Sequence, residues 1–223
     1  MLLNLLRGGD IVNIIVGIFV SAFVVFCILP IHEYAHAFVA DKLGDHTARE
    51  QGRLTLSPFA HVNWMGALMI LLVGFGYAQP VPVNVSNTKL KNKKLAMALI
   101  ALAGPLSNLL VAFLSVLCMF LIVRFAGTIT VIANAFIIFF QYCAIININL
   151  AVFNLIPIPP LDGSRILFCI LPTKYYFSVM KYERYIVIGL LILLFTGILS
   201  KPLSFLSNAV YGGMVDIFRM IFG

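Results

Sequence analysis

The sequence is organised around residues 27–38, which read Cys27-Ile28-Leu29-Pro30-Ile31-His32-Glu33-Tyr34-Ala35-His36-Ala37-Phe38. Histidines four residues apart share one face of a helix, so His32 and His36 can turn imidazole nitrogens toward one metal ion. Glu33 lies beside that ion, where its carboxylate can take a proton from water. This H-E-x-x-H pattern supplies two zinc ligands and a base, and it predicts metal-assisted peptide hydrolysis.

The composition is that of a membrane protein. Apolar residues make up 62% of the chain and charged residues 10%, and the mean hydropathy is +1.06, whereas a soluble domain has about a quarter of its residues charged. The 15 basic residues exceed the 8 acidic ones, but they lie between apolar runs, where they set membrane orientation rather than bind nucleic acid. The apolar flanks strengthen the metal prediction, because ionisable groups at membrane depth persist where they pair, bind or react.

We predict an all-α polytopic membrane protein with about five to six transmembrane helices. A small membrane-associated β or re-entrant region is expected between the first two core helices. The chain is expected to form one domain over residues 1–223, with a core at about 11–170 and C-terminal helices at about 184–223. The apolar runs predict helices at about 11–40, 95–123, 130–153 and 184–199, while residues 203–223 either cross the membrane or lie at its interface.

The region between the first helices has a mixed pattern. Alternating residues predict a strand at 53–57, and the proline-rich residues 80–85 predict an extended segment buried against protein near the metal site. Residues 64–78 are apolar, but they are fewer than the roughly 20 that a crossing helix needs, so a re-entrant element is an alternative to a full span. The four cysteines stand singly and predict neither disulfides nor a cysteine zinc site.

The missing zinc ligand is expected in residues 154–167, where three prolines break the helix among apolar neighbours. Asp162 is the only carboxylate between Glu50 and Glu183, so no other acidic side chain in that interval competes for the role of third ligand. Asp162 could at the same time be the N-cap of the following helix.

Charge and ligand geometry favour the same topology. If residues 64–78 turn back, His32, His36 and Asp162 reach one side of the membrane. If they cross fully, Asp162 lies on the side opposite the histidines unless both lie deep in the bilayer. The re-entrant arrangement places most basic residues on the same side of the membrane as the ligands. By the positive-inside rule that side is cytoplasmic. We therefore predict a multi-pass protein of the cell membrane whose N-terminus lies outside the cell. The cytoplasmic side would hold Lys42, Arg49, Arg53, Lys89, Lys91, Lys93, Lys94, Arg165, Lys174, Lys181 and Arg184.

Three stretches together resemble the motifs of the site-2 protease family, the intramembrane zinc metalloproteases. In the family's order, they are His32-Glu33-Tyr34-Ala35-His36, Gly104-Pro105-Leu106-Ser107-Asn108, and Asn154 through Leu161-Asp162-Gly163. The chain is similar in particular to the compact subgroup, on residues 52–58 and 80–84. No inserted PDZ or CBS module is visible in the sequence.

The resemblance implies cleavage of a transmembrane segment of another membrane protein within the lipid bilayer. His32, His36 and Asp162 would ligate one Zn²⁺ per chain, and Glu33 would act as the general base. Asn154 matches an asparagine that the family places eight residues before its aspartate, and it would hold the substrate or its oxyanion. Residues 53–57 and 80–85 would pair with an unwound substrate strand.

Two other classes of protein compete with this interpretation. A zinc-binding membrane transporter would also place histidines and an aspartate in membrane helices, but it would not need Glu33 beside them. A non-catalytic membrane protein would explain neither the histidine pair nor Asp162. We expect the two remaining histidines, His46 and His61, to be loop or surface residues.

Overall fold

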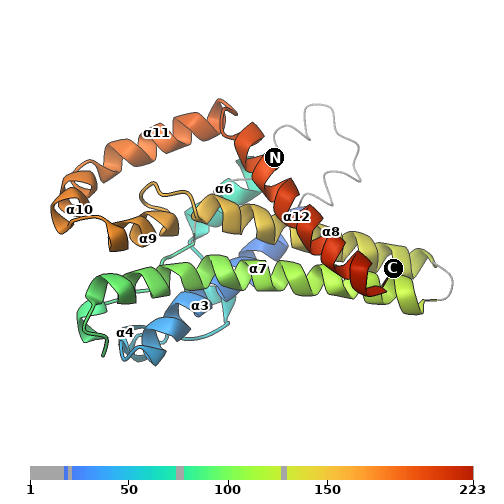
Figure 1. Ribbon diagram of the computed structural model, residues 1–223, viewed down its shortest axis with the longest axis horizontal. Coiled ribbons are helices and arrows are strands. Elements are labelled where there is room, and N and C mark those ends of the chain that lie inside the picture. Colours follow the sequence, from blue (N-terminus) through green and yellow to red (C-terminus); the bar gives the residue numbers. More distant parts are fainter. Residues whose placement is uncertain (1–17, 20–21, 74–77, 127–129, 223) are drawn as a thin grey trace. The chain divides into compact units, whose positions relative to one another are not determined.

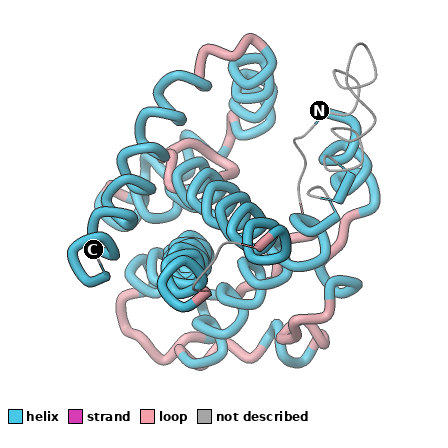
Figure 2. The backbone as a smooth tube through the Cα atoms, turned by 90° about the vertical axis from the view of Figure 1, so that its right-hand side faces the viewer, coloured by secondary structure: helices cyan, strands magenta, loops and turns pink. Residues whose placement is uncertain are grey.

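The computed structural model describes residues 18–19, 22–73, 78–126 and 130–222, and these form helices and loops without a strand (Figure 2). The predicted all-α class is therefore confirmed for the described residues. The start of the first predicted helix, at Ile11, lies outside them. The chain divides into two compact units, residues 1–104 and 105–223, and each is described by itself.

In the first unit, the helix that carries the H-E-x-x-H motif begins with a change of pitch. A π-helical turn, η1 (Val24–Ile28), leads into α3 (Leu29–Lys42), and the N–H of Leu29 reaches back five residues to the carbonyl of Val24. Pro30 follows at once, and it cannot donate a hydrogen bond because it has no N–H. Single π-turns beside such residues are frequent at functional sites. Together η1 and α3 are apolar and long enough to cross a membrane.

Short elements follow α3. They are α4 (Thr47–Glu50), α5 (Pro58–His61), α6 (Trp64–Val73) and η2 (Val85–Asn87). With 10 residues, α6 is about 15 Å long, half the thickness of a bilayer's hydrocarbon core. Residues 74–77, which continue the predicted apolar segment, lie outside the described residues, so the re-entrant interpretation of residues 64–78 stays a prediction.

The strand predicted at 53–57 is wrong, because these residues form bends and irregular chain. Pairing would need a neighbouring backbone with N–H groups, and the nearby segment contains Pro80 and Pro82, which have none. The side chain of Arg53 reaches this segment instead: its guanidinium donates to the carbonyl oxygens of Gln79 and Pro80 at 2.6 and 3.2 Å.

The prediction that this second segment is buried against protein is confirmed at Val81. Its side chain is 8% exposed and packs in a small apolar cluster with Ala37 of α3 and Ala48 of α4. Leu54 and Val83 cover the cluster from outside. Residues 78–84 are thus held against the helix that carries the histidines.

The second unit is built on long helices whose predicted positions are confirmed. Helix α7 (Lys93–Phe125) runs from the first unit into the second, and α8 (Val131–Asn154) is capped by Thr130, whose hydroxyl accepts the N–H of Ala133. The remaining helices are α9 (Asp162–Ile170), α10 (Thr173–Met180), α11 (Glu183–Phe195) and α12 (Ser200–Phe222).

Small residues and aromatic rings form the core of this unit. Helices α8 and α12 lie side by side in Figure 1, and Phe218 of α12 is 3% exposed against Phe113 and Phe120 of α7. The buried members of the core are Ala112, Val116, Ala144, Ile148 and Phe218. Small residues at such contacts let membrane helices approach closely.

The predicted five to six membrane spans are not confirmed. Among the described residues, three helices are long and apolar enough to cross: Val24–Lys42, α7 and α8. Helices α11 and α12 meet at a bend of 79°. They add a fourth span only if the two together are counted as one broken membrane-spanning helix. The sequence left two alternatives for residues 203–223, a crossing helix or a segment at the membrane interface. In the structure these residues belong to α12 up to Phe222.

Candidate metal centre

Helix α3 turns His32 and His36 toward each other from adjacent turns. Their side chains are 6% and 8% exposed, and their Nε2 atoms are 3.1 Å apart. Two nitrogens bound to one tetrahedral zinc ion at about 2.05 Å would be roughly 3.3 Å apart. The two imidazoles therefore fit a shared metal ion, as the spacing of the motif predicts.

The other nitrogen of His36 is held by the start of α7. Its Nδ1 lies 2.7 Å from the carbonyl oxygen of Ile100. A carbonyl only accepts hydrogen bonds, so Nδ1 carries the proton and Nε2 keeps its lone pair for a metal. A second hydrogen bond of this kind orients the ring of nearly every metal-binding histidine. The sequence contains no local signal for this partner, which lies 64 residues away.

Gly104 gives α7 its close approach to the histidine pair. A Cβ atom at this position would lie 2.3 Å from Nε2 of His36 and 2.5 Å from Cε1 of His32, which is closer than real contacts allow. Any side chain at position 104 would displace the two rings. The motif glycine before Pro105 is therefore explained by the space that the imidazoles occupy.

Glu33 is half-buried and is also held by a distant residue. Its Oε2 accepts the backbone N–H of Val81 at 3.0 Å. Since Pro80 and Pro82 have no N–H, Val81 supplies the only backbone donor of this Pro-Val-Pro run. The carboxylate of the predicted base is thus oriented by the segment that the sequence places near the metal site, although no pattern predicted this particular hydrogen bond.

In the second unit, Asn154 is the last residue of α8 and Asp162 the first of α9. The N-cap role predicted for Asp162 is wrong, because Leu161 occupies that position and its carbonyl accepts the hydroxyl and the N–H of Ser164. Gly163 packs against the end of α8, where a Cβ would lie 2.2 Å from the carbonyl oxygen of Leu155. This close turn sets where Asp162 stands after Asn154.

The first unit thus brings His32, Glu33 and His36 together, while the second places Asn154 and Asp162 at the two ends of the connection between α8 and α9. That Asp162 joins the histidines as third ligand stays a prediction. So does the role of Asn154.

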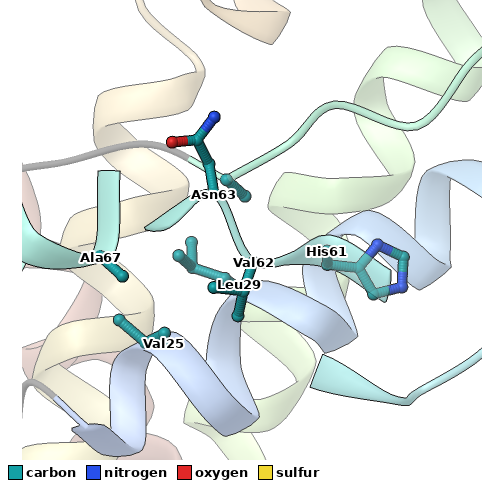
Figure 3. A pocket seen from close by; sticks show the side chains of 7 residues that line it. Val25, Leu29, His61, Val62, Asn63 and Ala67 are labelled. Carbon is teal, nitrogen blue, oxygen red and sulfur yellow. The ribbon is translucent and has the colours of Figure 1, made fainter. Parts of the chain in front are cut away.

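The expectation that His61 is a surface residue is wrong. It is 1% exposed, and its Nε2 donates to the carbonyl of Thr55 at 2.8 Å. Figure 3 shows a narrow hollow beside it, lined among others by Val25, Leu29 and Val62, from which the ring of His61 turns away. The hollow is too small for a water molecule and therefore is no substrate site. His46 is exposed, as expected.

Known proteins support the chemistry of this centre. The model of the family described as Peptidase family M50 matches residues 119–196. YwhC of Bacillus subtilis, a protein named as a zinc metalloprotease, is 38% identical over 192 residues, which cover 86% of this chain and 87% of YwhC. Rip2 of Mycolicibacterium smegmatis, also named as a zinc metalloprotease, is 34% identical over 60% of this chain and 51% of its own length. No solved structure gave a significant match.

These relatives define the class of the protein, which is a zinc metalloprotease. The chain belongs to peptidase family M50, the site-2 protease family, as its three motifs predict. With its long apolar helices, it is a multi-pass membrane protein.

Proposed function

We propose that this protease cleaves peptide bonds within or near the transmembrane segments of other membrane proteins. The observation that carries the proposal is the position of the histidine pair, which is buried within an apolar stretch, Val24–Lys42, long enough to cross a membrane. Ionisable groups in such a helix are costly unless they bind or react. A protease with its metal ligands there acts on bonds drawn into the membrane.

We further propose that His32, His36 and Asp162 hold one zinc ion per chain. The 3.1 Å separation of the two Nε2 atoms supports the first two ligands. Two observations support Asp162 as the third ligand. It is the only carboxylate between Glu50 and Glu183, and it matches the aspartate of the family motif. Two imidazoles and one carboxylate are a ligand set of catalytic zinc sites, which leave a position open for the reaction.

The side chains then divide the chemistry among them. A bound zinc ion polarises the scissile carbonyl and makes water more acidic. Glu33 takes the proton of the attacking water, whose oxygen bonds to the carbonyl carbon, and returns it to the amine as the C–N bond breaks. Asn154 donates its side-chain N–H to the oxygen that becomes negative. We place the unwound substrate against residues 80–85, because a peptide bond inside a helix is closed to attack and Val81 of this segment contacts the base Glu33.

The substitution Glu33→Gln tests this function. It removes the base but no metal ligand, so we expect zinc content to be unchanged and cleavage of a single-span reporter, whose helix contains a Gly-Pro pair, to fall by at least about 100-fold. Zinc is measured by mass spectrometry on the purified protein in detergent, and cleavage in proteoliposomes. Glu50→Gln, at an exposed glutamate of α4, is the matched control and should keep full activity.

Unchanged cleavage by the Glu33→Gln variant would contradict the proposal. The competing transporter function predicts zinc flux into liposomes that depends on His32 and persists when Glu33 is replaced. Flux without cleavage would favour the transporter.

The proposed topology puts the metal centre toward the cytoplasm and the N-terminus outside. It is supported by the excess of basic residues on the loops after α3, after α6 and around α9 to α11. Single cysteines at the exposed positions Glu50 and Ser86, in a chain without its four native cysteines, should react with an impermeant thiol reagent from the same side. Labelling from opposite sides would contradict the re-entrant arrangement.

A further inference from the structure

Two carboxylates are buried at the C-terminal end of α3 and just beyond it, outside the metal centre. Asp41 is 5% exposed and Asp45 is 0% exposed. Asp41 accepts hydrogen bonds from Nδ1 of His46 at 2.7 Å and from the guanidinium of Arg49. Both partners lie within eight residues, so Asp41 closes a local hairpin between α3 and α4.

Asp45 has different partners. One carboxylate oxygen accepts the backbone N–H and the hydroxyl of Thr47 and the side-chain amide of Asn87, and the other accepts the backbone N–H of Asn84 at 2.6 Å. A buried carboxylate is costly unless donors surround it, and here four donors satisfy both oxygens. The bond to Asn84 joins residues 39 positions apart.

Asn84 ends the segment that also contacts Glu33. Residues 80–84, here called the 80–84 segment, read Pro80-Val81-Pro82-Val83-Asn84. The N–H of Val81 donates to Glu33 at 3.0 Å, and three residues later the N–H of Asn84 donates to Asp45. The prolines restrict the backbone between these two points. One short, stiff segment is therefore held by one carboxylate at each end.

We propose that Asp45 is a positioning residue for Glu33: by binding the N–H of Asn84 it fixes the 80–84 segment, whose Val81 N–H orients the carboxylate of the base. The inference rests on the proposed role of Glu33 in peptide hydrolysis. A general base acts only within hydrogen-bond reach of the proton that it takes, and a displacement of about 1 Å can cost about 100-fold in rate. The same segment is proposed to contact the substrate, so Asp45 would support both tasks.

The test compares Asp45→Asn with Asp41→Asn, a matched change at the second buried carboxylate. In Asp45→Asn, one of the two carboxylate oxygens is replaced by an NH₂ group. Whichever way the amide is oriented, this NH₂ group faces the N–H of Asn84 or the donors of Thr47, and that hydrogen bond is lost. We expect the cleavage rate of the single-span reporter to fall at least about tenfold, with zinc content unchanged. Asp41→Asn should cleave at nearly the wild-type rate, because its partners do not reach the 80–84 segment.

Hydrogen exchange gives a readout that does not depend on activity. Because prolines have no amide hydrogen, residues 80–84 contain only three exchanging backbone amides: Val81, Val83 and Asn84. In the full-length protein in detergent, Asp45→Asn should accelerate exchange at both Val81 and Asn84. Glu33→Ala should accelerate it at Val81, and Asp41→Asn at neither.

Two results would overturn the inference. One is that Asp45→Asn accelerates only Asn84 and cleaves at the rate of Asp41→Asn; the other is that both aspartate variants behave alike. If Asp45→Asn does not fold, Asp45→Glu keeps the charge but moves the carboxylate by one methylene group, and faster exchange at Asn84 with unchanged exchange at Val81 in that variant overturns the inference as well. If Glu33→Gln still cleaves, the proposed function fails, and the exchange data still decide whether Asp45 positions the segment.

Discussion

The two halves of the proposed zinc site are held in place in different ways. In the first unit, the functional side chains depend on partners far along the chain: His36 on Ile100, 64 residues away, and Glu33 on Val81, 48 residues away. In the second unit, Asp162 is placed by its own surroundings, a turn in which Gly163 lies against the carbonyl of Leu155. One half is assembled by tertiary contacts and the other by a local turn.

This difference determines how each half should respond to damage. The contacts around the histidines involve rings that can turn when no metal holds them. The contacts around Asp162 involve backbone carbonyls, which cannot move without moving the helix ends. Two glycine substitutions, one in each half, separate these cases.

The largest effect is expected from Gly163→Ala. The added methyl group would lie 2.2 Å and 2.5 Å from the carbonyl oxygens of Leu155 and Ile156, and no side-chain rotation relieves a clash with backbone. We expect the free energy of unfolding to fall by about 3 kcal/mol, the upper end of the usual cost of overpacking. The loss should already be present without zinc, as measured by unfolding of the zinc-free protein in mixed detergent micelles.

Gly189→Ala in α11 is the control for Gly163→Ala. A Cβ at Gly189 meets nothing within 4 Å, so this change should leave stability unaltered or raise it by up to about 1 kcal/mol, because alanine is the better helix former. If Gly163→Ala were as stable as Gly189→Ala, the turn would not be the rigid element that the comparison assumes.

A smaller and more selective effect is expected from Gly104→Ala. Its methyl group would meet Nε2 of His36 and Cε1 of His32, and these rings can turn aside only by giving up their shared geometry. We expect zinc affinity, measured by competition with a chelator, to fall about 10- to 100-fold, as for other residues that orient metal ligands. The stability of the zinc-free protein should stay within about 1 kcal/mol of the wild type.

Two results would contradict this contrast between the movable histidine rings and the rigid turn at Gly163. If Gly104→Ala lowered the stability of the zinc-free protein as much as Gly163→Ala does, the histidine side would be as rigid as the turn. Unchanged zinc affinity would mean that the rings bind no metal in the orientation seen here.

The sequence predicts the features of the fold and site that depend on local pattern, and it fails for those that depend on contacts between distant residues. The metal-binding spacing of α3, the long helices α7 and α8 and the break after Asn154 all depend on local periodicity, proline and glycine, and all were predictable. The partner Ile100 was not, because every residue has a backbone carbonyl and this one leaves no mark in the sequence. The segment of Val81 was expected near the metal site, but its hydrogen bond to Glu33 was not predicted. Local pattern thus identifies the reactive side chains, and tertiary structure identifies what orients them.

The wrong predictions have a related cause. The alternating residues 53–57 have the period of a strand, but a strand also needs a partner, and the proline-rich neighbour supplies none. His61 was expected to be a loop or surface residue, whereas it is 1% exposed and lies beside Val25 and Leu29 of the helix that carries the histidines. In both cases the sequence pattern was local, and the outcome depended on residues far along the chain.

The smallest expected effect is on the free energy of unfolding at low pH. It tests whether the carboxylate of Asp45 is part of the hydrogen-bond network of the first unit. Burial alone would raise the pKa of Asp45, but hydrogen bonds from Thr47, Asn84 and Asn87 outweigh it and hold the pKa below its usual value. A lowered folded-state pKa means that the ionised carboxylate stabilises the fold at any pH above its unfolded pKa, about 3.9. This contribution is lost as the pH falls through the lower, folded value.

We therefore expect the wild type to be more stable than Asp45→Asn by a constant margin between about pH 5 and 8, and this margin to shrink below about pH 4. Unfolding is measured on the zinc-free proteins, so that metal release does not contribute. A margin that widens in acid would mean that the folded-state pKa of Asp45 lies above its unfolded value, so that burial outweighs the hydrogen bonds. Asp45 would then be a weak anchor for the link from Asn84 through Val81 to Glu33.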